Sequence, residues 1–246
     1  MSERTALPSV RVSGSGVVAG GVYDVVHGSG SVKCDGDITA REIRASGSIR
    51  IDGSVRSQEF ESSGSASIRG GVAAENFSVS GSCTIDGALA VRQTAHASGS
   101  MKVAGAVTGE EVEGAGSLRC NDSISLEGLH WRGALSCPGL VTADSIRISL
   151  HGTSTIGELA GARIEISLGS SLGILSEIFG VVRDHRLNVD EVSGDVVRLE
   201  HTTAKIVRGD EVIIGPKSRI QRVEYRGSLT IDPTSEVAEP VRISRD

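Results

Sequence analysis

Apolar and polar residues alternate in short runs that recur along most of the chain at a period of about 17 residues. A Gly-Ser pair, or a close variant of it, opens each unit, and successive first glycines lie 16 to 19 residues apart. Counted from that glycine, apolar residues recur at positions two, four, eight and thirteen, with polar neighbours between them. Alternation of this kind is typical of β-strands. The unit-opening glycines are Gly14, Gly30, Gly47, Gly64, Gly81, Gly99, Gly116, Gly133, Gly152 and Gly169.

The columns of this repeat predict the fold. Position thirteen is apolar except at His27 and Thr94. Each unit therefore predicts one coil with three short strands, and stacking such coils about 4.8 Å apart would pair each strand in parallel with its neighbours. The uneven spacing of the inward columns favours a right-handed parallel β-helix over the left-handed hexapeptide helix of many acyltransferases. Position four carries Val18, Cys34, Ile51, Ile68, Ile85, Val103, Cys120, Cys137 and Ile156, and position eight carries Val22, Ile38, Val55, Val72, Leu89, Val107, Ile124 and Val141.

Composition supports a narrow core. Aromatic residues make up only 2% of the chain, whereas 32 glycines and 5 prolines indicate frequent turns with most backbone donors retained. The net charge of −6 comes with no basic block, which argues against nucleic acid as a partner.

The register breaks after Gly169. Leu172, Leu175, Ile178, Phe179 and Val182 fall at helical spacing, so residues 171–182 are expected to form a short helix or lid. When positions are counted back by 17 residues from Gly227, apolar residues again fall at the strand positions of the repeat. We therefore expect a tail at 1–12, a main β-helix at 13–170, a linker at 171–186, a smaller β-helical stack at 187–240 and a tail at 241–246. Whether the second stack continues the first is left open by the pattern.

No constellation of residues indicates catalysis, a cofactor or a metal. The four cysteines fall in apolar columns and read as buried hydrophobic residues. The six histidines share no column, and the recurrent Asp-Gly pairs are ordinary turn dipeptides. We expect a protein that is not an enzyme and has no small-molecule substrate, with a hexapeptide-type transferase as a distant alternative.

The repeated pattern of Gly47–Val55, G-S-I-R-I-D-G-S-V, resembles the bactofilins, bacterial polymer-forming cytoskeletal proteins built on a right-handed β-helix. The run from Gly194 to Tyr225 resembles the closing segment of a longer, two-part bactofilin-like subgroup. This resemblance implies a cytoplasmic scaffold linked to cell shape or motility.

Self-association is also expected on physical grounds, because an uncapped β-helix end can stack on another copy. The residues expected at the two ends are Val12, Val17, Val18, Val22, Leu229, Ile231 and Val237. The alternative is a capped adaptor that recruits a protein partner or a membrane surface through residues 171–182. No signal-peptide or membrane-spanning stretch is found, so we expect a cytoplasmic location, with membrane association as an additional possibility.

Overall fold

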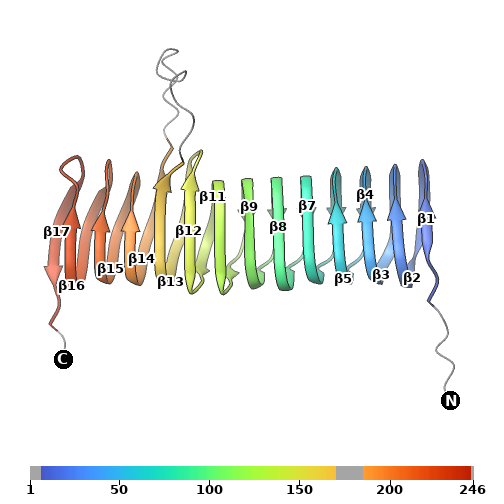
Figure 1. Ribbon diagram of the computed structural model, residues 1–246, viewed down its shortest axis with the longest axis horizontal. Helices are drawn as coiled ribbons and strands as arrows, with labels where there is room; N and C mark the ends of the chain where they lie inside the picture. Colours follow the sequence, from blue (N-terminus) through green and yellow to red (C-terminus); the bar gives the residue numbers. More distant parts are fainter. Residues whose placement is uncertain (1–6, 170–184, 245–246) are drawn as a thin grey trace, which may run out of the picture. The chain divides into compact units, whose positions relative to one another are not determined.

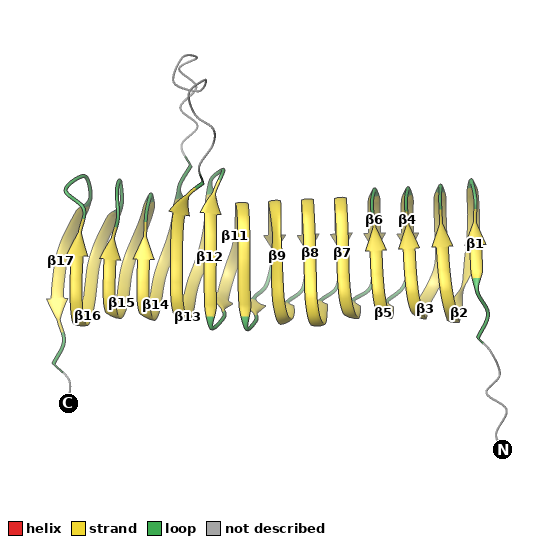
Figure 2. Cartoon of the chain, viewed as in Figure 1, coloured by secondary structure: helices red, strands yellow, loops and turns green. Residues whose placement is uncertain are grey.

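The computed structural model describes residues 7–169 and 185–244, and within these ranges the secondary structure is entirely β-strand (Figure 2). The paired strands run parallel and form a β-solenoid of about 13 turns with about 17 residues per turn. This confirms the predicted fold class. The described part of the chain contains no helix long and apolar enough to cross a membrane.

The chain divides into two units, residues 1–113 and 114–246, which are described separately. Strand β9 (Val107–Cys120) begins in the first and ends in the second. The first unit otherwise contains β1 (Val10–Val12), β2 (Ser15–Gly28), β3 (Ser31–Ala45), β4 (Ser48–Ile51), β5 (Val55–Ser62), β6 (Ser65–Ile68), β7 (Val72–Ile85) and β8 (Leu89–Val103) (Figure 1). The second contains β10 (Ile124–Ser125), β11 (Gly128–Thr142), β12 (Ser145–Leu150), β13 (Ser154–Leu168), β14 (Leu187–Leu199), β15 (Thr202–Ile214), β16 (Arg219–Ile231) and β17 (Glu236–Arg242).

Each turn has three faces, and each face of a regular turn points two side chains inward. In the turn that opens at Gly30, the first face buries Val32 and Cys34, the second buries Ile38 and Ala40, and the third buries Ile43 and Ala45. These are positions 2 and 4, 8 and 10, and 13 and 15 after the glycine. The core is therefore a stack of columns of aliphatic side chains, as the alternation predicted. The largest residues in the first unit's core, Phe60 and Phe77, stack on successive turns with ring centroids 5.0 Å apart.

Two turns of the first unit depart from the 17-residue spacing, and both correct the sequence alignment. The register shifts between Ala19 and Gly21, so that Gly21 pairs with Ile38 and Val22 pairs with Thr39. Val22 therefore points outward and is 55% exposed, contrary to its assignment to an inward column. Downstream of the shift, Val26 replaces His27 in the third-face column.

In the second irregular turn a register shift also moves the buried position by one residue. A register shift between Ala74 and Phe77 pairs Phe77 with Ala95, so Ala95 takes the buried place that counting had given to Thr94. Both apparent exceptions in the repeat were one-residue differences in turn length.

The first unit explains the repeated glycine. A Cβ atom added to Gly30, Gly47 or Gly64 would overlap the carbonyl oxygen of the unit-opening glycine one turn earlier. The same holds for Gly81 and Gly99, which also have φ values of +120° and +117°. Glycine is required at this corner because no side chain fits between stacked backbones.

The second unit keeps this glycine contact between Gly133 and Gly116, and its later turns use hydroxyl groups near the same corner. The N–H of Leu135 donates to Ser154 Oγ at 3.0 Å, and the N–H of Thr202 donates to Ser218 Oγ at 3.3 Å. The N–H of Ser218 donates in turn to Ser235 Oγ at 2.8 Å. Ser154, Thr202 and Ser218 are buried. The hydroxyl groups of Ser154, Ser218 and Ser235 accept from backbone donors that would otherwise lack a partner, and the Thr202 hydroxyl donates to the carbonyl of Glu200.

Strands β13 and β14 pair directly, although residues 170–184 separate them in sequence. Ser154 pairs with Leu187, Leu159 with Val192 and Ile166 with Leu199. The strands at 187–240 therefore continue the stack that contains β13, which answers the question that the sequence left open.

Candidate functional site

The C-terminal turn of the second unit exposes its inward residues. Leu229 and Ile231 stack on Val212 and Ile214 on the third face, and Val237 stacks on Ile220 on the first face. Their partners one turn earlier are buried, whereas Leu229 and Val237 are half-buried and Ile231 is 38% exposed. On the second face the last inward residue is Pro240, which pairs with Val223. Leu229, Ile231, Val237 and Pro240 are called the C-terminal turn below.

The backbone of this turn is also open on one side. Within the described residues β17 pairs only with β16, and the segment around Leu229 pairs only with β15. An unpaired strand edge of this kind offers donors and acceptors to a further strand. Pro240 removes one donor from the edge, and the remaining residues of β17 keep theirs.

The N-terminal turn of the first unit is partly closed by its own side chains. Within the described residues β1 pairs only with β2, with Val10 opposite Val26 and Val12 opposite Gly28. A methyl group of Val12 occupies the space beside Gly16 where a side chain would stand. Val10 and Val12 are half-buried. Val10, Val12, Val18 and Gly21, the first inward residues of this unit, are called the N-terminal turn below.

The residues expected at the two ends therefore have different environments. Val18 is only 4% exposed, so it belongs to the sealed core and a charge there would disturb folding. Val17, which pairs with Lys33, is 66% exposed and faces outward. The sequence analysis did not include Val10 and Pro240 among the residues of the two ends. Each shares a column with a residue one turn away, Val26 for Val10 and Val223 for Pro240, so counting by one turn would have found both.

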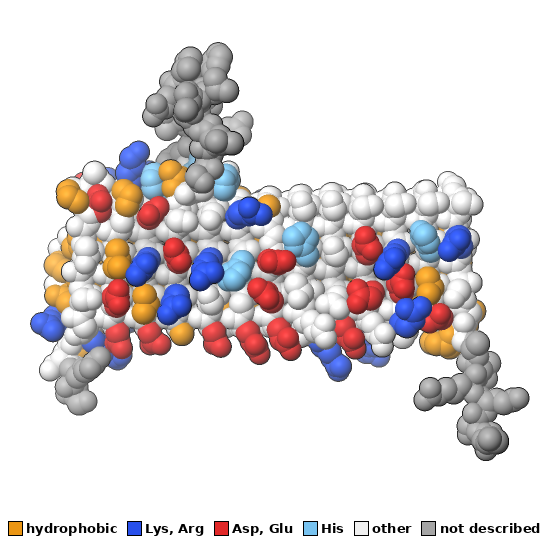
Figure 3. Space-filling model, viewed as in Figure 1, with side chains coloured by type: hydrophobic (Ala, Val, Ile, Leu, Met, Phe, Trp, Pro, Cys, Tyr) orange, Lys and Arg blue, Asp and Glu red, His pale blue; other side chains and the backbone are white. Residues whose placement is uncertain are grey.

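Side chains on the surface are of both signs, and in the second unit they pair between turns. Arg208 lies between Glu191 and Glu224, and Glu224 also accepts from Arg222 Nε at 2.7 Å. The hydrogen bond from Arg208, followed by that from Arg222, lowers the pKa of Glu224. Arg219 and Arg222 reach forward to Glu236 and Glu239 of β17. Figure 3 shows these mixed charges and, over the β16–β17 end, exposed hydrophobic side chains.

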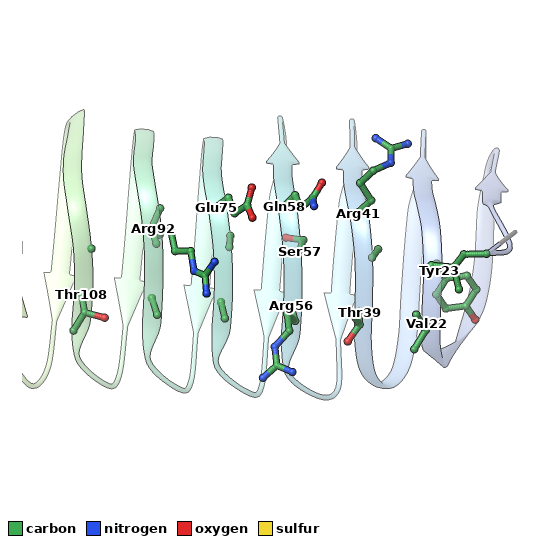
Figure 4. A pocket seen from close by; sticks show the side chains of 17 residues that line it. Val22, Tyr23, Thr39, Arg41, Arg56, Ser57, Gln58, Glu75, Arg92 and Thr108 are labelled. Atoms are coloured by element: carbon green, nitrogen blue, oxygen red, sulfur yellow. The ribbon is translucent and has the colours of Figure 1, made fainter. Parts of the chain in front are cut away.

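A groove of about 600 Å³ lies on one side of the first unit (Figure 4). Its floor is formed by small residues of successive turns, including Ala73 and Ala90, and its walls include Arg56, Arg92 and Glu75. Ala73 and Ala90 lie in the outward column of the second face, in register with Arg56, so the hollow follows from the short side chains in this column. It carries no cysteine or histidine.

The cysteines lie in the core as expected. All four are free and buried. Burial raises the pKa of Cys34 to about 11 and that of Cys83 to about 12. A hydrogen bond with Cys120, together with burial, raises the pKa of Cys137. The thiols of Cys34, Cys83 and Cys137 are therefore in the unreactive protonated form at neutral pH.

Two of the six histidines lie near each other. His151 and His185 have ring centroids 6.5 Å apart, and their Nδ1 atoms lie 3.2 Å and 3.4 Å from the carbonyl oxygens of Ser149 and Leu150. Among residues 7–169 and 185–244, no group of three or more potential ligands is placed to hold a metal ion.

The alternative docking segment cannot be placed in this geometry. Leu172, Leu175, Ile178, Phe179 and Val182, expected to form a helix or lid, lie outside the described residues.

Comparison with known proteins identifies two relatives. The chain is 33% identical over 105 residues to the uncharacterized protein YhbE of Bacillus subtilis (strain 168), covering 43% of this chain and 44% of that protein. It is 34% identical over 106 residues to the uncharacterized protein YhbF of the same strain, covering 43% of this chain and 42% of that protein. The alignments thus span less than half of each relative. No family model and no solved structure matches the chain.

Proposed function

We propose that this protein is a nonenzymatic scaffold of the bactofilin type, which self-assembles in the cytoplasm through the terminal turns of its β-solenoid and supports cell shape or motility. The observation that carries the proposal is the open C-terminal turn. Ile231 would be a core residue if one more turn followed it, and the preceding residues of its column, Ile214 and Leu199, are buried.

The driving force is the burial of inward residues that are half-buried or exposed in the last described turn. A further turn would cover Leu229, Ile231 and Val237 and would pair the free edge of the last strands. Apolar burial contributes roughly 25 cal/mol per Å² of area removed from water, and edge pairing satisfies the exposed backbone groups. Both contributions are available to a second copy of the chain because its first turn has the same three-faced form.

The test is assembly of the full-length protein with a charge at the open end. Ile231→Arg should abolish assembly, because burying an unpaired charge costs about 2 kcal/mol or more and so raises the critical concentration at least about tenfold. Assembly is measured by light scattering and by negative-stain electron microscopy at two concentrations and two salt levels. Val12→Glu tests the other end in the same way.

Leu140→Arg is the matched control. Leu140 is 40% exposed, close to the 38% of Ile231, but it lies on the side of the second unit and not in its last turn. This variant should assemble like the unaltered protein. Equal particle sizes for Ile231→Arg and the unaltered protein would contradict the proposal, as would uniformly small particles of the unaltered protein.

A further inference from the structure

The groove on the side of the first unit is long and narrow. Residues of six successive turns line it, from Val22 in the turn that opens at Gly14 to Thr108 in the turn that opens at Gly99 (Figure 4). Five intervals of about 4.8 Å separate these turns, so the groove is roughly 24 Å long. An extended chain advances about 3.3 Å per residue, and this length therefore holds a single extended segment of about seven residues.

The floor of the groove is apolar, and its backbone is paired on both sides. Ala73 and Ala90 face outward from adjacent turns. Val22, which is 55% exposed, lies at one end of the groove beside Tyr23. Ala73 pairs with Arg56 in the turn before it and with Ala90 in the turn after it. A ligand therefore cannot add a strand here, and the groove has to recognise it through side chains.

Arginines give the groove a charge opposite to that of the chain as a whole. Arg41, Arg56 and Arg92 are among the lining residues, and Glu75 is the only acidic residue among those that the structure describes there. The whole chain, in contrast, has a net charge of −6. Arg41 already has a partner, because its Nε donates to Asp24 Oδ1 at 2.8 Å. The groove is thus a basic strip on an acidic protein.

The other two arginines are not occupied in this way. Within residues 7–169 and 185–244, neither Arg56 nor Arg92 forms a hydrogen bond or an ion pair through its guanidinium group, although Glu75 lies in the turn between them. Figure 4 shows both guanidinium groups extending away from the Glu75 carboxylate. An unpaired guanidinium beside an apolar floor is suited to bind a carboxylate through two parallel hydrogen bonds.

We propose that this groove binds an extended acidic segment of a partner protein. Val22 and Arg56 are two turns apart in one column, and Arg92 lies two turns beyond Arg56. Two turns span about 9.6 Å, which is close to three residues of an extended chain. The segment therefore carries an apolar residue and two carboxylates at intervals of three, with small residues between them over the alanine floor. This role goes beyond self-assembly and uses no residue of the C-terminal turn.

Fluorescence anisotropy with labelled synthetic peptides tests the proposal on the full-length protein. The probes are L-A-S-E-A-S-E and its reverse, E-S-A-E-S-A-L, both with blocked ends, because the segment can run in either direction along the groove. At least one of them should bind, and salt should weaken the binding. For the L-A-S-E-A-S-E probe, the matched peptides are L-A-S-K-A-S-K, with the opposite charge, and L-A-S-E-E-S-A, with the same composition but adjacent glutamates. The reverse sequences of these two peptides serve the second probe. Each should bind at least about tenfold more weakly than its probe.

Variants of the groove locate the binding. Arg56→Gln combined with Arg92→Gln should weaken binding at least about tenfold, because both carboxylates lose their partners. Ala90→Trp fills the floor at an exposed position and should weaken binding without a change of charge. Arg11→Gln combined with Lys102→Gln is the matched control, which removes the same charge at exposed positions outside the groove and should bind like the unaltered protein. Circular dichroism verifies that each variant is folded.

Other occupants of the groove predict different results. Failure of both probes to bind the unaltered protein would overturn the proposal, as would equal affinity in the double arginine variant. Arginine-dependent binding of phosphatidylglycerol vesicles, without peptide binding, would instead assign the groove to a membrane surface. Smaller assemblies of the double arginine variant, again without peptide binding, would assign it to a contact between copies. Ile231→Arg should bind the peptide normally, so loss of assembly and loss of this binding are distinguishable.

Discussion

The first unit and the later turns of the second unit build the corner of the turn by different chemistry. In the first unit Gly30, Gly47 and Gly64 let each backbone lie directly on the carbonyl of the previous turn. In the second unit Ser218 and Ser235 hold the corresponding backbone groups through hydroxyl hydrogen bonds. The first solution depends on the absence of a side chain, and the second on the presence of a specific polar atom. Corners of the same fold are therefore sensitive to opposite substitutions: one to the addition of a side chain, the other to the loss of a hydroxyl group.

The largest effect is expected from Gly64→Ala. The new Cβ would overlap the carbonyl oxygen of Gly47, and a backbone atom cannot move aside as a flexible side chain can. We expect a loss of about 2 to 3 kcal/mol in the free energy of unfolding, comparable to severe overpacking of a core. Chemical denaturation followed by circular dichroism measures it.

Gly152→Ala is the control for this experiment. Gly152 opens a turn in the second unit, and a Cβ there would lie 3.4 Å from the Cβ of Ala134, which the neighbour can accommodate by a small shift. Its unfolding free energy should change by less than half as much. Equal losses in the two variants would show that the glycine corner does not differ between the units.

An intermediate effect is expected from Ser218→Ala. This change removes the acceptor for the Thr202 N–H and the donor to the Leu199 carbonyl, both at buried positions. Leaving a buried backbone donor without a partner costs about 1 to 3 kcal/mol. Thermal unfolding should show a lowered Tm, by about 2 to 4 °C per kcal/mol. Ser228→Ala, at an exposed position of the same strand, should leave the Tm unchanged.

The smallest effect concerns the charges between turns of the second unit. The pKa of Glu224 is lowered by Arg208 and Arg222, so its ion pairs stabilise the folded state above the unfolded pKa of about 4.3. That stabilisation is lost as the pH falls through the lower folded-state pKa. Glu224→Gln should therefore cost less than about 1 kcal/mol at pH 7, and its difference from the unaltered protein should disappear in acid.

Measuring unfolding free energy between pH 7 and pH 3 checks this expectation. Glu127→Gln, at an exposed position of the same unit, is the control variant. A cost for Glu224→Gln that stays constant down to pH 3 would mean that packing, not charge, accounts for it.

Periodicity alone was enough to predict the solenoid and nearly all of its core. The columns at positions four and thirteen are buried where counting placed them, because an inward position repeats once per turn. Counting failed at Val22, His27 and Thr94, where one turn is a residue shorter and another a residue longer than usual. A fixed 17-residue period does not show where in a turn a residue is lost or gained, because either of the two neighbouring corners could be the one that is shorter or longer.

The terminal surfaces were predicted less completely. Leu229, Ile231 and Val237 could be found from their columns, but exposure at an end depends on where stacking stops. Val18 was expected at the end together with Val17 and Val22, but only the latter two are exposed, and Val18 is buried. The hydroxyl corner escaped notice because serine and threonine at a turn usually indicate a solvated loop, not a buried acceptor.

The direct pairing of β13 with β14 has a practical consequence for experiments in cells. Stacking across that junction depends on Ser154–Ile166 and Leu187–Leu199, whatever chain joins them. A fluorescent protein inserted between Gly169 and His185 would therefore leave both terminal turns free. We expect such a fusion to report the position of the protein in living cells more faithfully than a tag attached at either terminus.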